Sequence, residues 1–283
     1  AATSTVCKGG TAMKAALIQM RTVSDKAENL RHARELIDEA AKNGADLCVL
    51  PEMFCCEYRN RSFIENQEPA GGPAWQMLSA AARENRVWLI GGSVPEAEDG
   101  KLYNTSFVFD REGNQAARCR KSHLFDIAVE GGQHFKESAT FTPGDEICSF
   151  DTEFGRLGLC ICFDMRFPEL ARIMSLDGAW AVFCPASFNM TTGPAHWEIM
   201  FRSRAVESQV YALGCAPARD EQGSYVSYAN SIAVSPWGDV LARAGAEETT
   251  LYVELDPAYV ESIRAQLPLM SARRTDMYTL RRV

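Results

Sequence analysis

The sequence predicts an α/β fold in which two mixed sheets pack face to face and helices cover their outer faces. Short apolar runs alternate with helical patterns through both halves of the chain. Each half also contains a hairpin-like pair of strands, and no linker, repeat or low-complexity tract separates the halves. Two such strand–helix halves favour two layers of sheet between two layers of helix.

In the first half, apolar runs indicate strands and amphipathic segments indicate helices. The helix expected over 25–43 has Ser24 as its N-cap and Gly44 at its end. Pro51 ends the apolar run over 46–50. The elements expected here are strands at 15–20, 46–50 and 87–91, helices at 25–43 and 74–85, and a hairpin of 103–110 with 115–120 around the turn 111–114.

The second half resumes this alternation and completes one predicted domain over 13–283, including a C-terminal tail. The expected elements are strands at 155–162, 180–184, 210–216 and 250–255, helices at 167–177, 194–207 and 257–266, and a hairpin of 230–235 with 240–242. Residues 1–12 are small and polar, and Met13 looks like a natural start. We therefore expect 1–12 to be a disordered extension or a remnant of cloning.

The composition is that of a globular chain of 283 residues, with 46% hydrophobic and 23% charged residues. These fractions exclude a disordered or collagen-like protein. No apolar run approaches the roughly 18 residues that a membrane span requires, so no membrane partner is expected. With 29 Lys+Arg against 37 Asp+Glu, the net charge of −8 argues against nucleic acid as a partner.

The ten cysteines are scattered rather than grouped in CxxC pairs, and most lie within apolar runs. A reduced thiol in such a run behaves as a small hydrophobic side chain. No signal-peptide pattern precedes Met13. The expectation is a reduced, intracellular and cytoplasmic protein, although the sequence leaves an organellar form open.

Three residues at the ends of predicted strands could carry chemistry. Cys162 lies between a strand and the start of a helix, where the helix dipole favours a thiolate. Glu52 follows a very apolar strand, which is expected to raise the pKa of its carboxyl group. Lys121 follows the second strand of the first hairpin. Taken singly, each has an ordinary explanation: a buried thiol, a loop carboxylate and a cation at a sheet edge.

In this order and with these flanks, the three residues resemble the nitrilase superfamily of carbon–nitrogen hydrolases, and the resemblance extends from Met13 to Tyr278. The matching blocks are Leu50-Pro51-Glu52, Arg120-Lys121-Ser122-His123-Leu124 and Cys162-Phe163-Asp164-Met165-Arg166-Phe167-Pro168-Glu169. The resemblance implies an α-β-β-α sandwich, in agreement with the alternation above. It also implies a cofactor-free enzyme that assembles as a homodimer or larger homo-oligomer.

The resemblance implies a role for each matching residue. Cys162 would be the nucleophile, Glu52 the general base, and Lys121 the cation that stabilises the tetrahedral oxyanion. The backbone N–H of Phe163 would be a second oxyanion donor, although many relatives carry Tyr at this position. Glu137, which by itself looks like a loop carboxylate, matches a second glutamate that would orient Lys121 and Glu52.

Within the superfamily, the sequence is most similar to the ω-amidase branch. The supporting segments are His123-Leu124-Phe125-Asp126-Ile127, the run from 187 to 198, and Ala216-Pro217-Ala218-Arg219-Asp220. This similarity implies hydrolysis of small dicarboxylate monoamides such as α-ketoglutaramate, α-ketosuccinamate and succinamate through a cysteine thioester. The sister branch that acts on deaminated glutathione shares part of these segments and is the alternative. The segment Cys55-Cys56-Glu57 differs from the loop expected before Tyr58.

A substrate that carries a carboxylate requires a cation, and Arg166 is the candidate because Arg can bind a carboxylate through two hydrogen bonds. The other explanation is that Arg166 pairs with Asp164 or Glu169 for structural reasons. Tyr58 and Thr192 are further candidates for the substrate pocket, although each could serve packing or a loop.

Three other functions compete with an amidase. A papain-like enzyme would need a histidine partner, and none of the four histidines lies in a local motif of that kind. A metal hydrolase would need ligands at metal-binding spacing, which the sequence lacks, so no metal site is expected. A non-catalytic assembly or scaffold protein on the same fold would be favoured if Glu52, Lys121 or Cys162 were missing, and all three are present.

Overall fold

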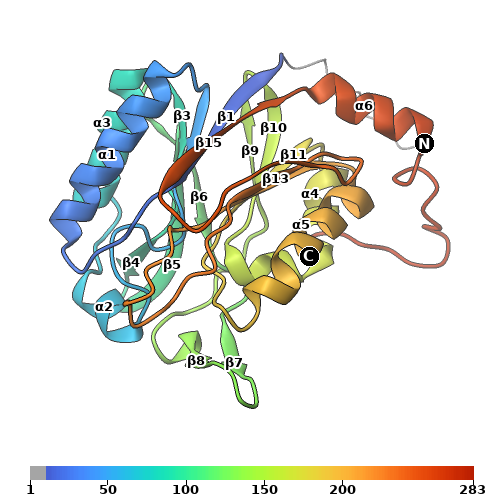
Figure 1. Cartoon of the computed structure of the whole chain (residues 1–283). Coiled ribbons are helices and arrows are strands. Elements are labelled where there is room, and N and C mark those ends of the chain that lie inside the picture. Colours follow the sequence, from blue (N-terminus) through green and yellow to red (C-terminus); the bar gives the residue numbers. More distant parts are fainter. Residues whose placement is uncertain (1–10) are drawn as a thin grey trace.

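A computed structural model describes residues 11–283 and places two mixed sheets face to face, with helices on their outer sides (Figure 1). The predicted architecture is thereby confirmed. The first sheet runs in the order β15 (Thr249–Leu255), β1 (Met13–Gln19), β2 (Leu47–Val49), β3 (Trp88–Ile90), β5 (Lys101–Phe109) and β4 (Val94–Glu98), with β6 (Gln115–Arg120) also paired to β5. The second runs β14 (Val240–Arg243), β13 (Ile232–Val234), β12 (Tyr211–Cys215), β11 (Ala181–Pro185), β10 (Gly155–Leu159) and β9 (Cys148–Thr152).

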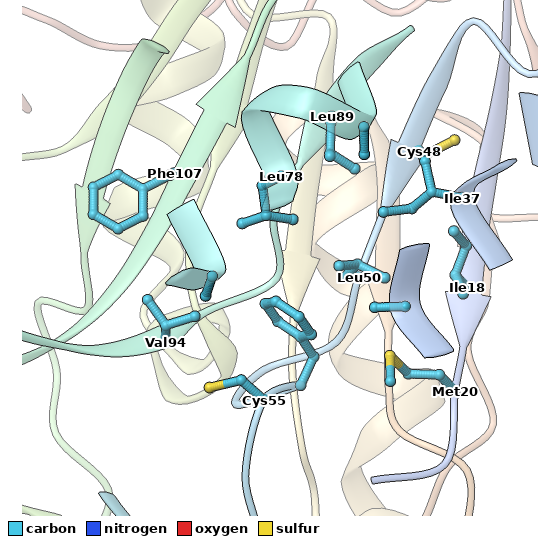
Figure 2. Packing of buried hydrophobic residues seen from close by; sticks show 14 of the residues in the cluster. Ile18, Met20, Ile37, Cys48, Leu50, Cys55, Leu78, Leu89, Val94 and Phe107 are labelled. Atoms are coloured by element: carbon cyan, nitrogen blue, oxygen red, sulfur yellow. The ribbon is translucent and has the colours of Figure 1, made fainter. Parts of the chain in front are cut away.

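The central strands are apolar on both faces because each sheet is covered on both sides. In β1, Ala16 and Ile18 face the helix layer, whereas Ala15 and Leu17 belong to the core between the sheets. Since side chains alternate along a strand, one continuous apolar run fills both layers. Figure 2 shows the helix-side layer of the first sheet, where Ile37 lies close to Ile18 and Cys48.

Six α-helices complete the described fold. Those that cover the first sheet are α1 (Lys26–Lys42) and α3 (Pro73–Asn85), and those over the second are α4 (Pro168–Leu176) and α5 (Gly193–Ser208) (Figure 1). The others are α2 (Asn60–Glu65) and α6 (Pro257–Gln266). None of the helices within 11–283 combines the length and the apolar character that crossing a membrane would demand.

Some local expectations differ from the structure. The N-cap of α1 is Asp25 rather than Ser24, because the Asp25 carboxylate accepts hydrogen bonds from the backbone N–H groups of Ala27 and Glu28. The short hairpin β7 (Asp126–Ala128) with β8 (His134–Lys136) was not expected, nor were α2, β4 and β9. The prediction for residues 1–12 falls almost entirely outside the described residues, which begin at Thr11.

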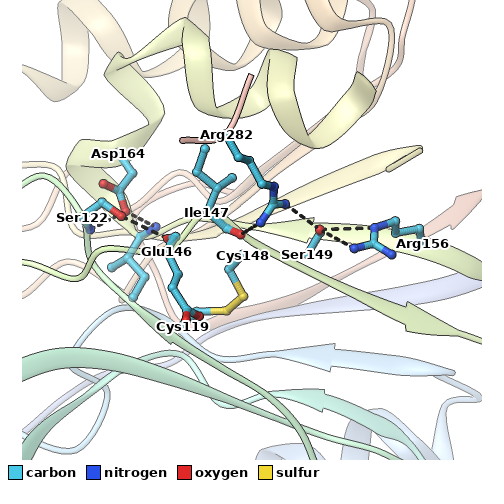
Figure 3. The surroundings of a disulfide bond; sticks show 10 residues. Cys119, Ser122, Glu146, Ile147, Cys148, Ser149, Arg156, Asp164 and Arg282 are labelled. Carbon is cyan, nitrogen blue, oxygen red and sulfur yellow. Dashed lines mark hydrogen bonds between the residues drawn. A yellow bond between two sulfur atoms is a disulfide. The ribbon is translucent and has the colours of Figure 1, made fainter. Parts of the chain in front are cut away.

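Two cysteines do not follow the expectation of a fully reduced chain. Cys119 of β6 and Cys148 of β9 are joined by a disulfide, with their Cα atoms 5.7 Å apart (Figure 3). This pairing links the two sheets, and only their face-to-face packing brings two residues 29 positions apart within disulfide reach. The other described cysteines are free and buried, namely Cys48, Cys55, Cys56, Cys160, Cys162, Cys184 and Cys215.

The arrangement of parallel strands positions the site. Strands β1, β2 and β3 are mutually parallel, as are β10, β11 and β12. In open α/β sheets, functional residues collect beyond the carboxyl ends of parallel strands. Here β2 leads directly to Glu52, and β10 leads to Cys162.

Candidate active site

Glu52 is held in a tight turn directly after β2. Met53 has a positive φ of 54°, and its N–H donates to the hydroxyl of Ser93 at 3.0 Å. Gly92 has a positive φ of 57° and lies so close that a Cβ there would be 2.2 Å from the carbonyl oxygen of Pro51. The turn therefore requires glycine at position 92 and directs Glu52 inward, where it is 2% exposed.

The Glu52 carboxylate is hydrogen-bonded mainly through one oxygen. Its Oε1 accepts from Lys121 Nζ at 2.8 Å, Asn104 Nδ2 at 2.9 Å and the Tyr58 hydroxyl at 3.3 Å. Its Oε2 is buried without such a donor among the described residues. Burial raises the pKa of Glu52, Lys121 lowers it and Glu137 raises it, so the net pKa is above the ordinary value.

Lys121 follows β6 by one residue and is 1% exposed. Its Nζ lies 2.8 Å from Oε1 of Glu52 and 2.8 Å from Oε2 of Glu137. Burial alone would lower the pKa of Lys121, but Glu137 and Glu52 outweigh it, and the pKa is well above the ordinary value. The ammonium group therefore stays charged inside the protein.

Glu137 connects this cluster to its surroundings. It is fully buried at the start of the 3₁₀ helix η1 (Glu137–Ala139), and its Oε1 accepts from Asn104 Nδ2 at 3.1 Å. Its Oε2 accepts from the backbone N–H of Phe125 at 2.5 Å. Glu137 thus contacts Lys121 directly and reaches Glu52 through the shared amide of Asn104.

Cys162 begins the 3₁₀ helix η2 (Cys162–Arg166) with a positive φ of 47°, a conformation that costs roughly 1–3 kcal/mol for a residue with a side chain. The thiol is buried beside Glu52 and accepts from the backbone N–H of Ser187 at 3.5 Å. Burial and the Glu52 charge raise the pKa of the Cys162 thiol well above its ordinary value. This direction opposes the thiolate that the position before a helix favours, because burial and the Glu52 carboxylate outweigh Lys121.

Asn104 and Asp164 were given no role in the candidate site by the sequence analysis, and both join segments that are distant in the chain. Asn104 bridges Glu52 and Glu137, as described above. Asp164 accepts hydrogen bonds from the N–H groups of Ile161 at 3.1 Å and His123 at 2.8 Å, and from the His123 ring at 2.8 Å. It thereby fastens the turn of the nucleophile to the segment after Lys121. The signal for Asp164 was its place within the Cys162 block.

Arg166 has no carboxylate within ion-pair distance in the described part of the chain, so it pairs with neither Asp164 nor Glu169. Its guanidinium lies 4.8 Å from the ring of Phe188 and 5.7 Å from that of Phe163, and one nitrogen is 3.1 Å from the Nδ1 atom of His196. Burial lowers the pKa of Arg166. A partly desolvated cation without a counter-ion is suited to an anionic ligand.

Two cavities are both lined by Tyr58 and Tyr225, whose ring centroids are 4.6 Å apart. The smaller, about 60 Å³, is lined by Glu52 and Ser187, among others. The larger, about 410 Å³, is lined by segments 133–135, 189–191 and 224–226 together with Arg59 and both tyrosines. Tyr58 thus lies where the sequence placed it, at the pocket.

The last two predicted residues contribute differently. Thr192 is buried, and its hydroxyl donates to Asn189 Oδ1 at 3.3 Å, so it lies behind the cavity lining formed by Asn189 and Thr191. Phe163 is the second residue of η2, a position whose backbone N–H has no partner within the helix. Among residues 11–283, no group of three or more His, Cys, Asp or Glu is placed to hold a metal ion.

Comparisons with known proteins identify the family of the chain. The model of the carbon-nitrogen hydrolase family matches residues 14–265. The omega-amidase NIT2 of Homo sapiens is 47% identical over 270 residues, covering 95% of this chain and 98% of the relative. The omega-amidase NIT2 of Bos taurus is 48% identical over 263 residues, covering 93% and 95%.

Solved structures show the same relationship. Saccharomyces cerevisiae Nit3, described as a member of branch 10 of the nitrilase superfamily, matches with a TM-score of 0.87 at 39% identity, over 94% of this chain and 98% of its own. A mutant amidase from Nesterenkonia sp. AN1, with acrylamide added to its active-site cysteine, matches with a TM-score of 0.76 at 27% identity, over 90% and 98%. The chain therefore belongs to the carbon–nitrogen hydrolases of the nitrilase superfamily and is a hydrolytic enzyme.

Proposed function

We propose that the protein is an ω-amidase that hydrolyses the terminal amide of α-ketoglutaramate, α-ketosuccinamate or succinamate to the dicarboxylate and ammonia. The amidase relatives support the reaction type. The observation that carries the proposal is the buried contact of Glu52 with both Lys121 and Cys162, together with an Arg166 that has no carboxylate partner within residues 11–283. This arrangement can activate a thiol, stabilise an oxyanion and attract an anionic substrate.

The first half-reaction forms a thioester. As the Cys162 sulfur attacks the amide carbon, its proton passes to Oε2 of Glu52, the oxygen that is free to accept it. The carbonyl electrons move to oxygen, where the Lys121 ammonium and the Phe163 N–H stabilise the negative charge, each such donor contributing about 10²–10³ in rate. The C–N bond then breaks while Glu52 returns the proton to nitrogen, and ammonia leaves.

The second half-reaction hydrolyses the thioester. Glu52 takes a proton from water, whose oxygen attacks the acyl carbon to give a second oxyanion at the same donors. Collapse of this intermediate breaks the C–S bond, and Glu52 returns the proton to sulfur. Because Lys121 stays charged throughout, it compensates Glu52 and holds the oxyanion in both halves.

The decisive test is replacement of the nucleophile, which also tests the scaffold alternative. Cys162→Ala should abolish ammonia release from succinamate while leaving the thermal midpoint of unfolding nearly unchanged. In the wild-type enzyme, rapid quenching and intact-mass analysis should detect the acyl group on the peptide that contains Cys162. Turnover by Cys162→Ala would rule out the thioester route, and an inactive wild-type enzyme on every amide would favour a scaffold.

The choice of substrate is tested by a panel of amides. We expect kcat/KM to be highest for α-ketoglutaramate or succinamate; a strong preference for deaminated glutathione would instead favour the sister branch. Arg166→Lys should raise KM selectively for amides that carry a carboxylate, because Lys lacks the planar two-bond geometry of Arg. An equal rise in KM for a neutral amide such as butyramide would show that Arg166 does not bind the substrate carboxylate.

A further inference from the structure

The side chain of Asn189 has a fixed orientation between β11 and α5. Its Oδ1 accepts from the backbone N–H groups of Thr191 and Thr192, both at 2.9 Å, and from the Thr192 hydroxyl at 3.3 Å. Backbone N–H groups can only donate, so the end of the amide that faces them must be the oxygen. The NH₂ group is therefore held on the other side.

That NH₂ group has no hydrogen-bond partner among the described residues, although Asn189 is only 3% exposed. Leaving a buried amide group without a hydrogen bond costs about 1–3 kcal/mol. A ligand that accepts a hydrogen bond from this NH₂ group would remove that cost and account for the arrangement. Asn189 also lines the cavity of about 410 Å³ with Tyr58 and Tyr225. An oriented donor thus lies at the wall of the cavity next to the catalytic cluster.

The same chain segment connects this donor with the nucleophile and with Arg166. Ser187, two residues before Asn189, donates its N–H to the sulfur of Cys162. Phe188, the residue between them, packs its ring 4.8 Å from the Arg166 guanidinium. Arg166 is also the last residue of η2, the short helix that Cys162 begins, so one turn of chain joins the cation to the nucleophile.

We propose that Asn189 is a substrate-binding residue whose Nδ2 group donates a hydrogen bond to the carboxylate at the non-reacting end of the substrate, next to Arg166. This inference rests on the proposed function, which supplies a substrate with such a carboxylate. A neutral N–H donor beside a cation makes carboxylate binding more directional, because a hydrogen bond requires a nearly linear N–H···O arrangement whereas charge attraction does not. The alternative is that Asn189 serves only the turn that begins α5.

The variant Asn189→Asp separates these two roles. Aspartate keeps an oxygen for the N–H groups of Thr191 and Thr192, so the turn remains, but it places a second oxygen where the NH₂ group was. At pH 8, we expect the ratio of kcat/KM for succinamate to that for butyramide to fall about 10- to 100-fold, mainly through KM. Asn189→Ala loses both roles and should in addition lower the thermal midpoint of unfolding.

Equilibrium binding gives a second readout that does not depend on turnover. In the Cys162→Ala background, calorimetry should show that glutarate binds about 10- to 100-fold more weakly once Asn189→Asp is added. The inference would be overturned if glutarate bound equally well with and without Asn189→Asp. It would also be overturned if Asn189→Asp lowered kcat/KM equally for succinamate and butyramide. If the wild-type enzyme prefers succinamate but the Asp variant keeps that preference, only the inference fails. If the wild-type enzyme favours butyramide and does not bind glutarate, the proposed function fails as well.

Discussion

At the scale of single residues, the site is a buried set of charges that stabilise one another. Two carboxylates flank one ammonium group, and all three side chains are excluded from water. Removing water would be costly for any of them alone, but Lys121 contacts both Glu52 and Glu137. Burial, and after it the Glu52 carboxylate, raise the pKa of the Cys162 thiol well above its ordinary value. The proposed mechanism therefore relies on Glu52 as a base rather than on a preformed thiolate.

The raised pKa of Glu52 predicts the acid side of the pH profile. The base must be ionised, so kcat/KM should fall as the pH drops through a pKa above the ordinary value for Glu. The pKa of Lys121 lies well above its ordinary value, so loss of its charge should not reduce activity between pH 7 and 9. The measurement is kcat/KM for succinamate against pH. An acid limb at or below the usual Glu pKa would contradict the role of Glu52.

Replacing the base without changing its shape gives a sharper result. Glu52→Gln retains an oxygen for Lys121 but can neither take the thiol proton nor return it to nitrogen. We expect kcat to fall about 10²–10⁴-fold, the usual contribution of general acid–base catalysis. Circular dichroism and thermal unfolding check that the fold persists. Activity within a factor of a few of the wild type would assign the base to another group.

At the scale of elements, the site depends on strands whose ends are held by close packing. Gly214 in β12 lies against α5, where a Cβ would be 2.4 Å from the ring of Phe201. Phe201 is fully buried and packs on Trp197 at a centroid distance of 4.7 Å, so it cannot move aside. The close approach of α5 to the second sheet thus requires glycine at this position.

This contact predicts a selective loss of stability. Gly214→Ala should lower the free energy of unfolding by about 1–3 kcal/mol, the usual cost of overpacking. Gly245→Ala is the matched control, because a Cβ there meets nothing within 4 Å. Thermal or urea unfolding of the two variants measures the difference. Equal stability of both would show that the interface between β12 and α5 can adjust.

The disulfide between Cys119 and Cys148 joins a strand of one sheet to a strand of the other, and Cys119 lies two residues before Lys121. The two cysteines are 29 positions apart, and closing a loop of this length should stabilise the protein by about 3–4 kcal/mol in the chain-entropy model. The double variant Cys119→Ser/Cys148→Ser should therefore unfold at a lower temperature, and dithiothreitol should affect only the wild type. Alkylation of every cysteine in unreduced, denatured protein would refute the bond.

At the scale of the whole molecule, one surface hollow has large apolar side chains exposed at its wall. A hollow of about 690 Å³ lies over α5 and the β13–β14 hairpin. Around it, Ile199 is 61% exposed and Trp237 is 55% exposed. Contiguous exposed apolar residues often mark a protein interface. The homo-oligomer expected from the sequence is proposed to form through this surface.

A charge placed on this surface should break the oligomer. We expect wild-type protein to sediment as a dimer of about twice 31.3 kDa or as a larger multiple. Ile199→Glu should shift it to the monomer, because an unpaired charge is costly in an apolar interface. Ile64→Glu on α2, also more than half exposed, serves as the control. A wild-type monomer at micromolar concentration would contradict the proposal.

Much of the fold could be predicted because it depends on patterns within short segments. The strand 115–120 and the helix 257–266 match their expected bounds. The cap of α1 was misplaced by one residue because Ser24 and Asp25 are adjacent and both favour that position. The β7–β8 hairpin was missed because its three-residue strands are too short to show an alternating pattern.

By itself, the sequence determined the layers and the order of most elements, and it predicted Glu52, Lys121 and Cys162 as the candidate site, since apolar periodicity and local motifs are properties of neighbouring residues. Only the tertiary structure decided which groups meet: Asn104 contacts both glutamates, and Cys119 is joined to Cys148. It also leaves Arg166 without a carboxylate partner in the described part of the chain. It also decided the direction in which the pKa of Cys162 is shifted, because burial and charge at a point depend on everything packed around it.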